Sequence, residues 1–353
     1  MRPPIRDTRV SSSQSVISPR GLSYEISVSD RAVATITSAR TEIASIIHGR
    51  SRRLIVVVGP CSIHDVAAAH EYADFIAEQR TLHQSSLAIL MRVYFEKPRT
   101  VTGWKGLLND PHLDGTYDVE AGLRAGRRLL CDLADRGIPA ASEILDPVSP
   151  QYLAELMSWA AIGARTIESQ THREMASGLS MPIGLKNGTE GTLQTALNGL
   201  RAAAEPHRFL GIDEEGRSAI ITTTGNRDAH LVLRGGLTGP NYQEAQVNAA
   251  SESLAAVGLC SRVMVDCSHD NSAKDYRRQT DVCADLARQI RRGQPILGVM
   301  IESNLVEGKQ PFPPEDGVQL RYGQSITDGC VALEATAHML DELADAVSSR
   351  PVE

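Results

Sequence analysis

The segment LIVVVGPCSIHD, residues 54–65, is the clearest indication of the fold. Its apolar run ends at Gly59 and Pro60, and Cys61 follows directly. An uninterrupted Val/Ile/Leu run, without alternating polar residues, predicts a strand that is buried on both faces of a parallel sheet. Glycine and proline end such a strand. Cys61 is therefore predicted at a strand end, where its thiol can face a pocket.

The same pattern recurs along the chain. Further apolar runs end at residues that bind metal, phosphate or carboxylate, namely LAILMR at Arg92, AASE at Glu143, IGAR at Arg165, IGLK at Lys186, HLVLR at Arg234, VMVDCSH at His269 and ILGVMIE at Glu302. Chemistry gathered at the carboxyl ends of parallel strands is typical of a (β/α)8 barrel. The sequence therefore predicts an α/β fold, a TIM barrel.

The length fits one barrel with additions. The chain has 353 residues, of which 42% are hydrophobic, and such barrels take about 250 residues. We expect the catalytic barrel over residues 51–350 and an N-terminal extension for oligomerisation or regulation over residues 1–50. Within the extension, residues 30–48 have helical spacing with Asp30 as the N-cap. Two β-prone runs around a DEEG turn predict an inserted β-hairpin at about 207–225.

The remaining elements are expected to alternate as strand and helix. The fourth barrel strand is expected near residues 162–167. Helices are expected at about 66–79, 150–160, 273–292 and 333–348, with others ending near 136 and following 191.

Composition excludes several classes of function. The net charge is −7, and the sequence has no basic tract and no zinc-finger spacing, so nucleic-acid binding is not expected. The N-terminal residues do not resemble a signal peptide, and no apolar run approaches the roughly 18 residues of a membrane span. We therefore expect a cytoplasmic protein without a membrane partner. The six cysteines have no framework spacing, so disulfides are not expected.

Lysine is rare in this chain. Of 36 basic residues only five are lysines, namely Lys97, Lys105, Lys186, Lys274 and Lys309. A lysine kept against this arginine bias suggests a need for a compact or titratable ammonium group. Lys97 and Lys186 both lie at predicted strand ends. Chance placement is the alternative explanation.

Four residues offer a mixed set of metal ligands: Cys61, His269, Glu302 and Asp328, the last in YGQSITDG. Sulfur, nitrogen and oxygen donors together suit Mn²⁺, Fe²⁺, Co²⁺ or Zn²⁺, whereas Mg²⁺ and Ca²⁺ prefer oxygen alone. Taken singly, each of the four could be structural. At one barrel mouth together, they predict a metal site.

Six cations form a second set. Arg92, Lys97 and Arg99 come from one segment, and Arg165, Lys186 and Arg234 come from three further strand ends. Convergent positive groups imply at least two bound anions, because unpaired buried like charges are costly. Bidentate arginines match phosphate and carboxylate geometry. The alternative is that these cations form rim salt bridges with Glu143, Glu168 and Glu190.

Together these motifs closely resemble type I 3-deoxy-D-arabino-heptulosonate 7-phosphate (DAHP) synthases of the feedback-regulated subgroup, over about residues 5–348. The segments that carry the resemblance are GPCSIHD (59–65), MRVYFEKPRT (91–100), GWKGLLNDP (103–111), IGARTIESQTHREMASGLSMPIGLKNGT (162–189), HLVLRGG (230–236), GPNY (239–242), VDCSHDNS (265–272), GVMIESNLVEG (298–308) and YGQSITD (322–328). The resemblance implies a metal-dependent, aldol-like condensation of phosphoenolpyruvate with erythrose 4-phosphate, the entry step of the shikimate pathway.

The resemblance also implies roles for individual residues. Cys61, His269, Glu302 and Asp328 correspond to the metal ligands. The phosphoenolpyruvate site corresponds to Arg92, Ala164, Arg165, Lys186 and Arg234, and the erythrose 4-phosphate site to Arg92, Lys97, Pro98, Arg99 and Thr100. In the implied mechanism, Lys97 protonates the alkoxide as it develops, and Glu143 and Lys186 are candidates for handling the attacking water.

One loop departs from the family pattern. The common loop is KPRTTVGW, whereas this chain has KPRTVTGW, with Val101 and Thr102 exchanged in character. We expect altered packing of the loop with activity retained; a shift in aldose preference is the alternative.

Regulation is implied by the extension and the hairpin. In the resembling subgroup they support subunit contacts and an allosteric pocket for an aromatic amino acid, a region that corresponds here to Asp7, Pro150 and Ser180. The stretches GLSMP, HRFLGI and VDCSH…KDYRRQ resemble tyrosine-sensitive members. A homodimer or homotetramer is expected. Three alternatives remain: an arm that only mediates oligomerisation, a secondary-metabolism paralogue with altered regulation or aldose, and a catalytically silent ligand-binding subunit.

Overall fold

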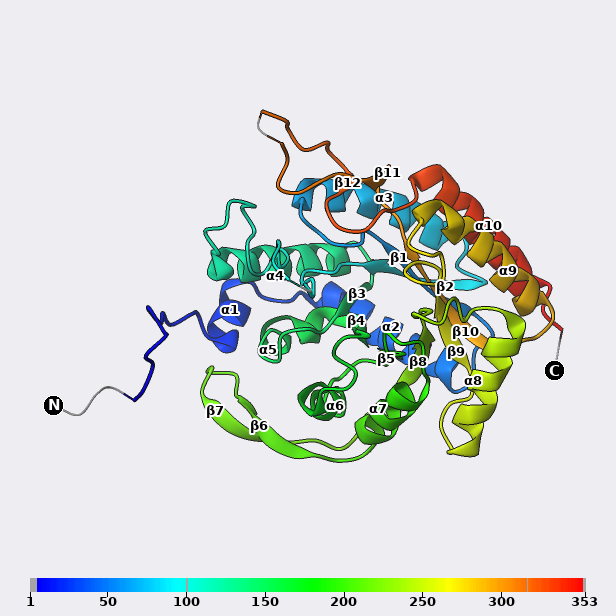
Figure 1. The fold of residues 1–353 in the computed structure, drawn as a ribbon, viewed down its shortest axis with the longest axis horizontal. Coiled ribbons are helices and arrows are strands. Elements are labelled where there is room, and N and C mark those ends of the chain that lie inside the picture. Colours follow the sequence, from blue (N-terminus) through cyan, green and yellow to red (C-terminus); the bar gives the residue numbers. More distant parts are fainter. Residues whose placement is uncertain (1–4, 100, 316, 352–353) are drawn as a thin grey trace.

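The protein is an eight-stranded parallel barrel, as predicted (Figure 1). The computed structural model describes residues 5–99, 101–315 and 317–351. Neighbouring strands run in the order β1-β10-β9-β8-β5-β4-β3-β2 around the closed barrel. The barrel strands are β1 (Leu54–Gly59), β2 (Leu87–Arg92), β3 (Ala140–Glu143), β4 (Met157–Ile162), β5 (Ile183–Lys186), β8 (His230–Leu233), β9 (Val263–Asp266) and β10 (Ile296–Glu302).

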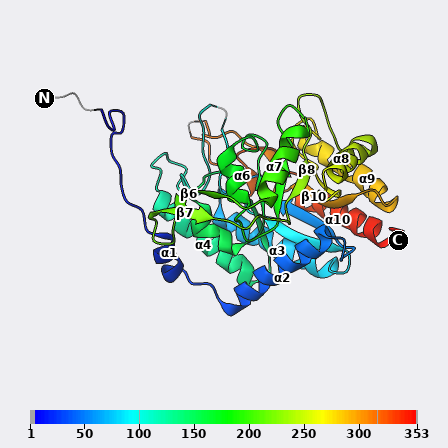
Figure 2. The ribbon, with the colours of Figure 1, turned by 90° about the horizontal axis from the view of Figure 1, so that it is seen from below.

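Helices surround the barrel and alternate with its strands (Figures 1 and 2). They are α1 (Pro19–Glu25), α2 (Asp30–Ile47), α3 (Val66–Leu82), α4 (Val119–Asp135), α5 (Pro150–Leu153), α6 (Gln170–Ala176), α7 (Gln194–Ala204), α8 (Glu244–Ala256), α9 (Gln279–Arg291) and α10 (Leu333–Ser348), with 3₁₀ turns at Ala154–Leu156 and Tyr276–Arg278. Asp65 and Asp118 cap α3 and α4 by accepting hydrogen bonds from first-turn amides. None of the described helices is long and apolar enough to cross a membrane.

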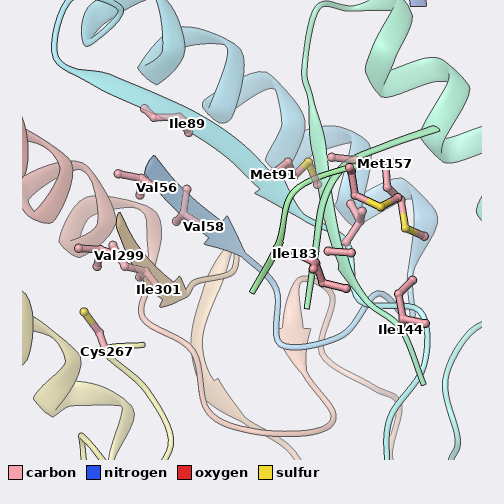
Figure 3. Packing of buried hydrophobic residues seen from close by; sticks show 14 of the residues in the cluster. Val56, Val58, Ile89, Met91, Ile144, Met157, Ile183, Cys267, Val299 and Ile301 are labelled. Atoms are coloured by element: carbon pink, nitrogen blue, oxygen red, sulfur yellow. The ribbon is translucent and has the colours of Figure 1, made fainter. Parts of the chain in front are cut away.

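Both faces of the barrel strands are buried, which explains the uninterrupted apolar runs. On β1, Val56 and Val58 pack outward against the helices, in one cluster with Ile89 and Val299 of the flanking strands (Figure 3). Ile55 and Val57 point the other way, into the barrel. Full burial of one such side chain contributes roughly 1.5–3 kcal/mol, so these strands stabilise the fold on both faces.

Helix α2 packs against the barrel and completes its interior. Ile43, Ile46 and Ile47 of this helix join the cluster formed by the inward-facing strand residues, and α2 contacts β1, β2 and β4. The predicted N-cap was wrong by one residue. Ser29 caps the helix through a hydrogen bond from the amide of Ala32, and Asp30 is the first helical residue. Ser29 is the residue with extended backbone, so only its hydroxyl can reach back to that amide.

The fourth strand lies earlier than predicted. Residues 150–160 were expected to be helical, but α5 covers only Pro150–Leu153, and β4 begins at Met157. Arg40 of α2 gives a physical reason, because its guanidinium donates hydrogen bonds to the carbonyls of Ala154 and Met157. Those carbonyls are thereby satisfied outside a helix. Without knowledge of Arg40, a short run such as MSWAAI is ambiguous between helix and strand.

Two further small sheets lie outside the barrel. The antiparallel pair β6 (Arg208–Ile212) and β7 (Ser218–Thr222) forms a hairpin between α7 and β8, and β11 (Val306–Lys309) pairs with β12 (Gln324–Ser325). Arg20 of α1 forms an ion pair with Glu214 in the hairpin turn. The segment before α1 points away from the barrel in both views (Figures 1 and 2).

Candidate active site

A cavity of about 550 Å³ lies at the carboxyl ends of the barrel strands. Every phosphate- or carboxylate-binding cation predicted from the sequence lines it, as do Pro98, Glu143 and Ala164. These cations are Arg92, Lys97, Arg99, Arg165, Lys186 and Arg234. The barrel thus brings residues that are more than 140 positions apart in the sequence to the mouth of one cavity. Thr100, also predicted there, lies outside the described residues.

Three of the four predicted metal ligands gather beside this cavity, which Asp328 lines. Ligand atoms of Cys61, Glu302 and Asp328 all lie within 4.8 Å of one another. The fourth residue, His269, lines the cavity, and its Nε2 atom lies 4.0 Å from Oε1 of Glu302. One thiol, two carboxylates and an adjacent imidazole form a donor set that fits a borderline divalent ion. Cys61, Glu302 and Asp328 could therefore hold a metal ion, and His269 lies next to them.

Glu302 is held in place by residues around it. Its Oε1 accepts a 2.8 Å hydrogen bond from Nη2 of Arg92, and its Oε2 accepts a 2.7 Å bond from the Ser268 hydroxyl. Burial raises the pKa of this carboxyl, but the charges of His269 and Arg92 outweigh it and lower the pKa below the ordinary value. Glu302 is therefore ionised at neutral pH and suited to bind a cation.

Arg92 makes several contacts within the protein in addition to its predicted role in binding substrate. Its side chain is 1% exposed, and it donates to the carbonyls of Pro60 and Cys61 in addition to Glu302. The guanidinium also stacks 3.4 Å from the ring centroid of Tyr94. These contacts fix the β1 loop that carries Cys61, so Arg92 positions the ligand cluster as well as lining the cavity.

Lys97 lies beside the thiol. Its Nζ is 3.0 Å from Sγ of Cys61. Burial raises the pKa of Cys61 to about 11, and the charge of Lys97 opposes that shift. Burial would lower the pKa of Lys97, but the charges of Cys61 and Glu302 raise it above its ordinary value. Lys97 is therefore protonated at neutral pH and able to donate a proton into the cavity.

A buried carboxylate that we did not single out from the sequence lies behind Lys186 and His269. Oδ2 of Asp266 is 3.1 Å from Nζ of Lys186 and 2.9 Å from Nδ1 of His269. Asp266 is fully buried, and the charges of His269 and Lys186 overcome burial to lower its pKa well below the ordinary value. His269 adopts a positive φ of 56°, which is uncommon outside glycine. Asp266 thus orients both side chains.

The ion pairs among the described residues do not support the alternative that these cations form rim salt bridges. Arg92 pairs with Glu302, Lys186 with Asp266, and Arg234 with Asp270. No ion pair among the described residues joins the six cations to Glu143, Glu168 or Glu190. Arg99 and Arg165 lack an acidic partner within 4.0 Å in that part of the chain. A cavity that is lined by two arginines without such a partner is suited to anionic ligands.

Comparisons with known proteins agree with this geometry. A family model described as the DAHP synthetase I family matches residues 25–341. The chain is 50% identical over 345 residues, 98% of each chain, to the "Phospho-2-dehydro-3-deoxyheptonate aldolase, Phe-sensitive" of Escherichia coli (strain K12). This chain belongs to the DAHP synthetase I family.

Other members of the family are equally close. The Tyr-sensitive aldolase of the same E. coli strain is 51% identical over 340 residues, which are 96% of this chain and 95% of that protein. A solved structure of the aldolase from Francisella tularensis SCHU S4 superposes with a TM-score of 0.95 at 48% identity, covering 97% of this chain and 100% of that one. Identities of 50% and 51% do not separate Phe-sensitive from Tyr-sensitive relatives.

The three residues predicted to be regulatory do not all lie at one place in the structure. Pro150 and Ser180 line a second cavity of about 500 Å³, together with Tyr24 of α1 and Glu214 of the hairpin. Asp7 does not line that cavity. It belongs to the segment before α1, where it forms an exposed ion pair with Arg6.

The loop that departs from the family pattern lies at the mouth of the first cavity. Val101 and Thr102 both line the cavity, and the side chain of Val101 is 85% exposed. An exposed valine here leaves the ligand cluster beneath untouched.

Proposed function

We propose that this chain catalyses the condensation of phosphoenolpyruvate with D-erythrose 4-phosphate and water to give DAHP and inorganic phosphate, the first step of aromatic amino acid biosynthesis. The observation that carries the proposal is that six cations line one cavity of about 550 Å³, which the Cys61–Glu302–Asp328 cluster adjoins through Asp328. Two phosphorylated substrates account for the cations. A Lewis-acid site accounts for the mixed donors.

The substrates divide between two parts of the cavity. Arg165, Lys186 and Arg234, which come from three strand ends and line one cavity, bind the phosphate and carboxylate of phosphoenolpyruvate. Arg99, with the segment 97–100, binds the phosphate of the aldose. C3 of phosphoenolpyruvate forms a bond to the aldehyde carbon, and Nζ of Lys97 donates a proton to the aldehyde oxygen. Water then adds at C2, and the C–O bond to phosphate breaks.

Two groups of the chain manage the attacking water. Glu143 is buried at the end of β3 and lines the cavity, as does Lys186. We propose that the Glu143 carboxylate accepts a proton from this water, while Lys186 holds the substrate over it. The Cys61, His269, Glu302 and Asp328 side chains would hold Mn²⁺, Fe²⁺, Co²⁺ or Zn²⁺, which would supply Lewis-acid polarisation of the aldehyde.

A single assay tests both the reaction and the metal. Protein, Mn²⁺ and the two substrates are expected to consume phosphoenolpyruvate, followed by loss of its ultraviolet absorbance, and excess EDTA is expected to abolish the rate. Adding back a divalent ion should restore it. Absence of consumption with any of the four metals would reject the enzymatic proposal in favour of a silent ligand-binding subunit. Turnover that EDTA leaves unchanged would reject the metal site alone.

We further propose that the second cavity binds an aromatic amino acid that inhibits the enzyme. Glu96 connects the two cavities: it precedes Lys97 in the chain, and its Oε2 accepts a 2.9 Å hydrogen bond from the hydroxyl of Ser149, next to Pro150. Burial raises the pKa of Glu96 to about 7, so this carboxyl is only partly ionised near neutral pH. A ligand against Pro150 can therefore displace the segment that carries Lys97, provided that it binds the two arrangements unequally.

Regulation is tested with phenylalanine, tyrosine and tryptophan added separately to the same assay. At least one is expected to inhibit at least fivefold, and Ser180→Phe, which fills the second cavity, is expected to relieve that inhibition while leaving uninhibited kcat within about twofold. A coupling free energy of about 1 kcal/mol or more corresponds to that fivefold effect. Insensitivity to all three amino acids would leave the arm with an assembly role only.

A homo-oligomer is part of the proposal. Leu210 and Ile220 face each other across the hairpin in register, and their side chains are 78% and 63% exposed. Paired exposed aliphatic residues on a two-stranded sheet suit contact with a second subunit. We propose that the hairpin and the segment before α1 supply this contact in a dimer or tetramer.

A further inference from the structure

Lys309 is a lining cation without a role in the scheme above. Four of the five lysines line the active-site cavity: Lys97, Lys186, Lys274 and Lys309. Lys97 contacts Cys61, Lys186 pairs with Asp266, and Lys274 lies 3.7 Å from Asp270. Lys309 differs, because no acidic oxygen among the described residues lies within 4.0 Å of its ammonium group. Lys309 acts on the Asp328 carboxylate through its charge without a direct ion pair, so its ammonium group can still contact a ligand.

Arg99 likewise has no acidic partner among the described residues, and it lines a side cavity together with Lys309. A cavity of about 500 Å³ adjoins the active-site cavity, and both are lined by Arg99, Lys309 and Asp328. The side cavity is otherwise lined by uncharged residues of the loops around β11 and β12. Two cations that form no ion pair among the described residues, with the Asp328 carboxylate between the two cavities, thus flank one opening of the active site.

The backbone that carries Lys309 is fixed on both sides. Gly308 exchanges two backbone hydrogen bonds with Cys330, of 2.8 and 3.1 Å, and the amide of Gln310 donates to the carbonyl of Ser325 at 2.8 Å. Both partners flank Asp328 in the chain. The backbone of Lys309 is therefore anchored to the same loop as a candidate metal ligand, so that its exposed side chain starts from a fixed point at the cavity.

We propose that Lys309 is a specificity-determining residue that binds the phosphate of the aldose substrate together with Arg99. The inference rests on the proposed function and adds a residue to it. An ammonium group provides a point charge that a phosphate accepts from many directions, while the Arg99 guanidinium offers directional hydrogen bonds. The two cations together would select an aldose that carries a terminal phosphate and set the distance from that phosphate to the aldehyde.

The test is steady-state kinetics of Lys309→Gln with both substrates varied. We expect the KM for erythrose 4-phosphate to rise about tenfold, as befits one charge-assisted contact to phosphate, while kcat and the KM for phosphoenolpyruvate stay within twofold. Lys309→Arg should restore the KM to within threefold. Lys105→Gln is the matched control, because Lys105 is an exposed lysine that lines neither cavity.

Binding of inorganic phosphate, measured by calorimetry, gives a readout that does not depend on turnover. Its affinity for the aldose site should fall in Lys309→Gln in parallel with the rise in KM. An unchanged KM for erythrose 4-phosphate would overturn the inference, and so would an equal rise in both KM values, which would indicate general electrostatic attraction. A wild-type protein without turnover would reject the proposed function, whereas unchanged phosphate binding in the variant would reject the Lys309 site.

Discussion

Replacing Lys97 by glutamine is expected to lower kcat by about 10²–10⁴-fold, the range for loss of a positioned general acid. Nζ of Lys97 lies beside the ligand cluster, 3.0 Å from Sγ of Cys61, and its raised pKa keeps it protonated when the aldehyde oxygen acquires negative charge. Glutamine retains a hydrogen-bond donor of similar length but cannot transfer the proton. The measurement is kcat at saturating concentrations of both substrates.

Lys97→Arg separates proton donation from charge. A guanidinium preserves the positive charge beside Cys61 but does not give up its proton at accessible pH. If Lys97 acts as the acid, the arginine variant should remain at least about 10²-fold impaired. A rate within threefold of wild type in Lys97→Arg would instead assign Lys97 a purely electrostatic role. Lys105→Gln controls for loss of a nearby lysine.

The fold was predictable because every barrel strand is buried on both faces. The runs LIVVVG and ILGVMIE are almost entirely apolar, and β1 and β10 cover them, each ending within one residue of the expected end. The fourth strand was misplaced because Arg40 binds the carbonyls of Ala154 and Met157, between α5 and β4, and these contacts join residues 114 and 117 positions apart. No local pattern contains that contact.

The site was predictable to the extent that its residues end strands. Cys61, Lys186 and Glu302 were found by position, since a barrel gathers strand ends at one mouth. Asp266 was not predicted, because the run VMVDCSH was interpreted only through His269 at its end. A carboxylate inside an apolar run nevertheless indicates a functional position. Lys309 was noted only as a rare lysine, because its contribution depends on the fold of two loops beyond the barrel.

Asp266 is the second position where a large effect is expected. Its carboxylate is fully buried against Nζ of Lys186 and Nδ1 of His269, and its Oδ1 accepts a 2.9 Å hydrogen bond from the amide of Ser268. Asp266→Asn keeps the volume but removes the charge. The Lys186 ammonium would then be buried without its partner, which costs about 3–5 kcal/mol. We expect the free energy of unfolding, measured by urea titration, to fall by that amount.

The same variant should weaken metal binding, because Asp266 orients His269. Loss of a carboxylate behind a ligating histidine typically lowers metal affinity 10–100-fold, which competition with a chromogenic chelator measures directly. Asp281→Asn on α9 is the control, since Asp281 is exposed and remote from the cavity. An Asp266→Asn protein with wild-type stability would contradict the burial argument. A destabilised variant with unchanged metal affinity would restrict Asp266 to supporting Lys186, and His269 would then be held by its own left-handed backbone.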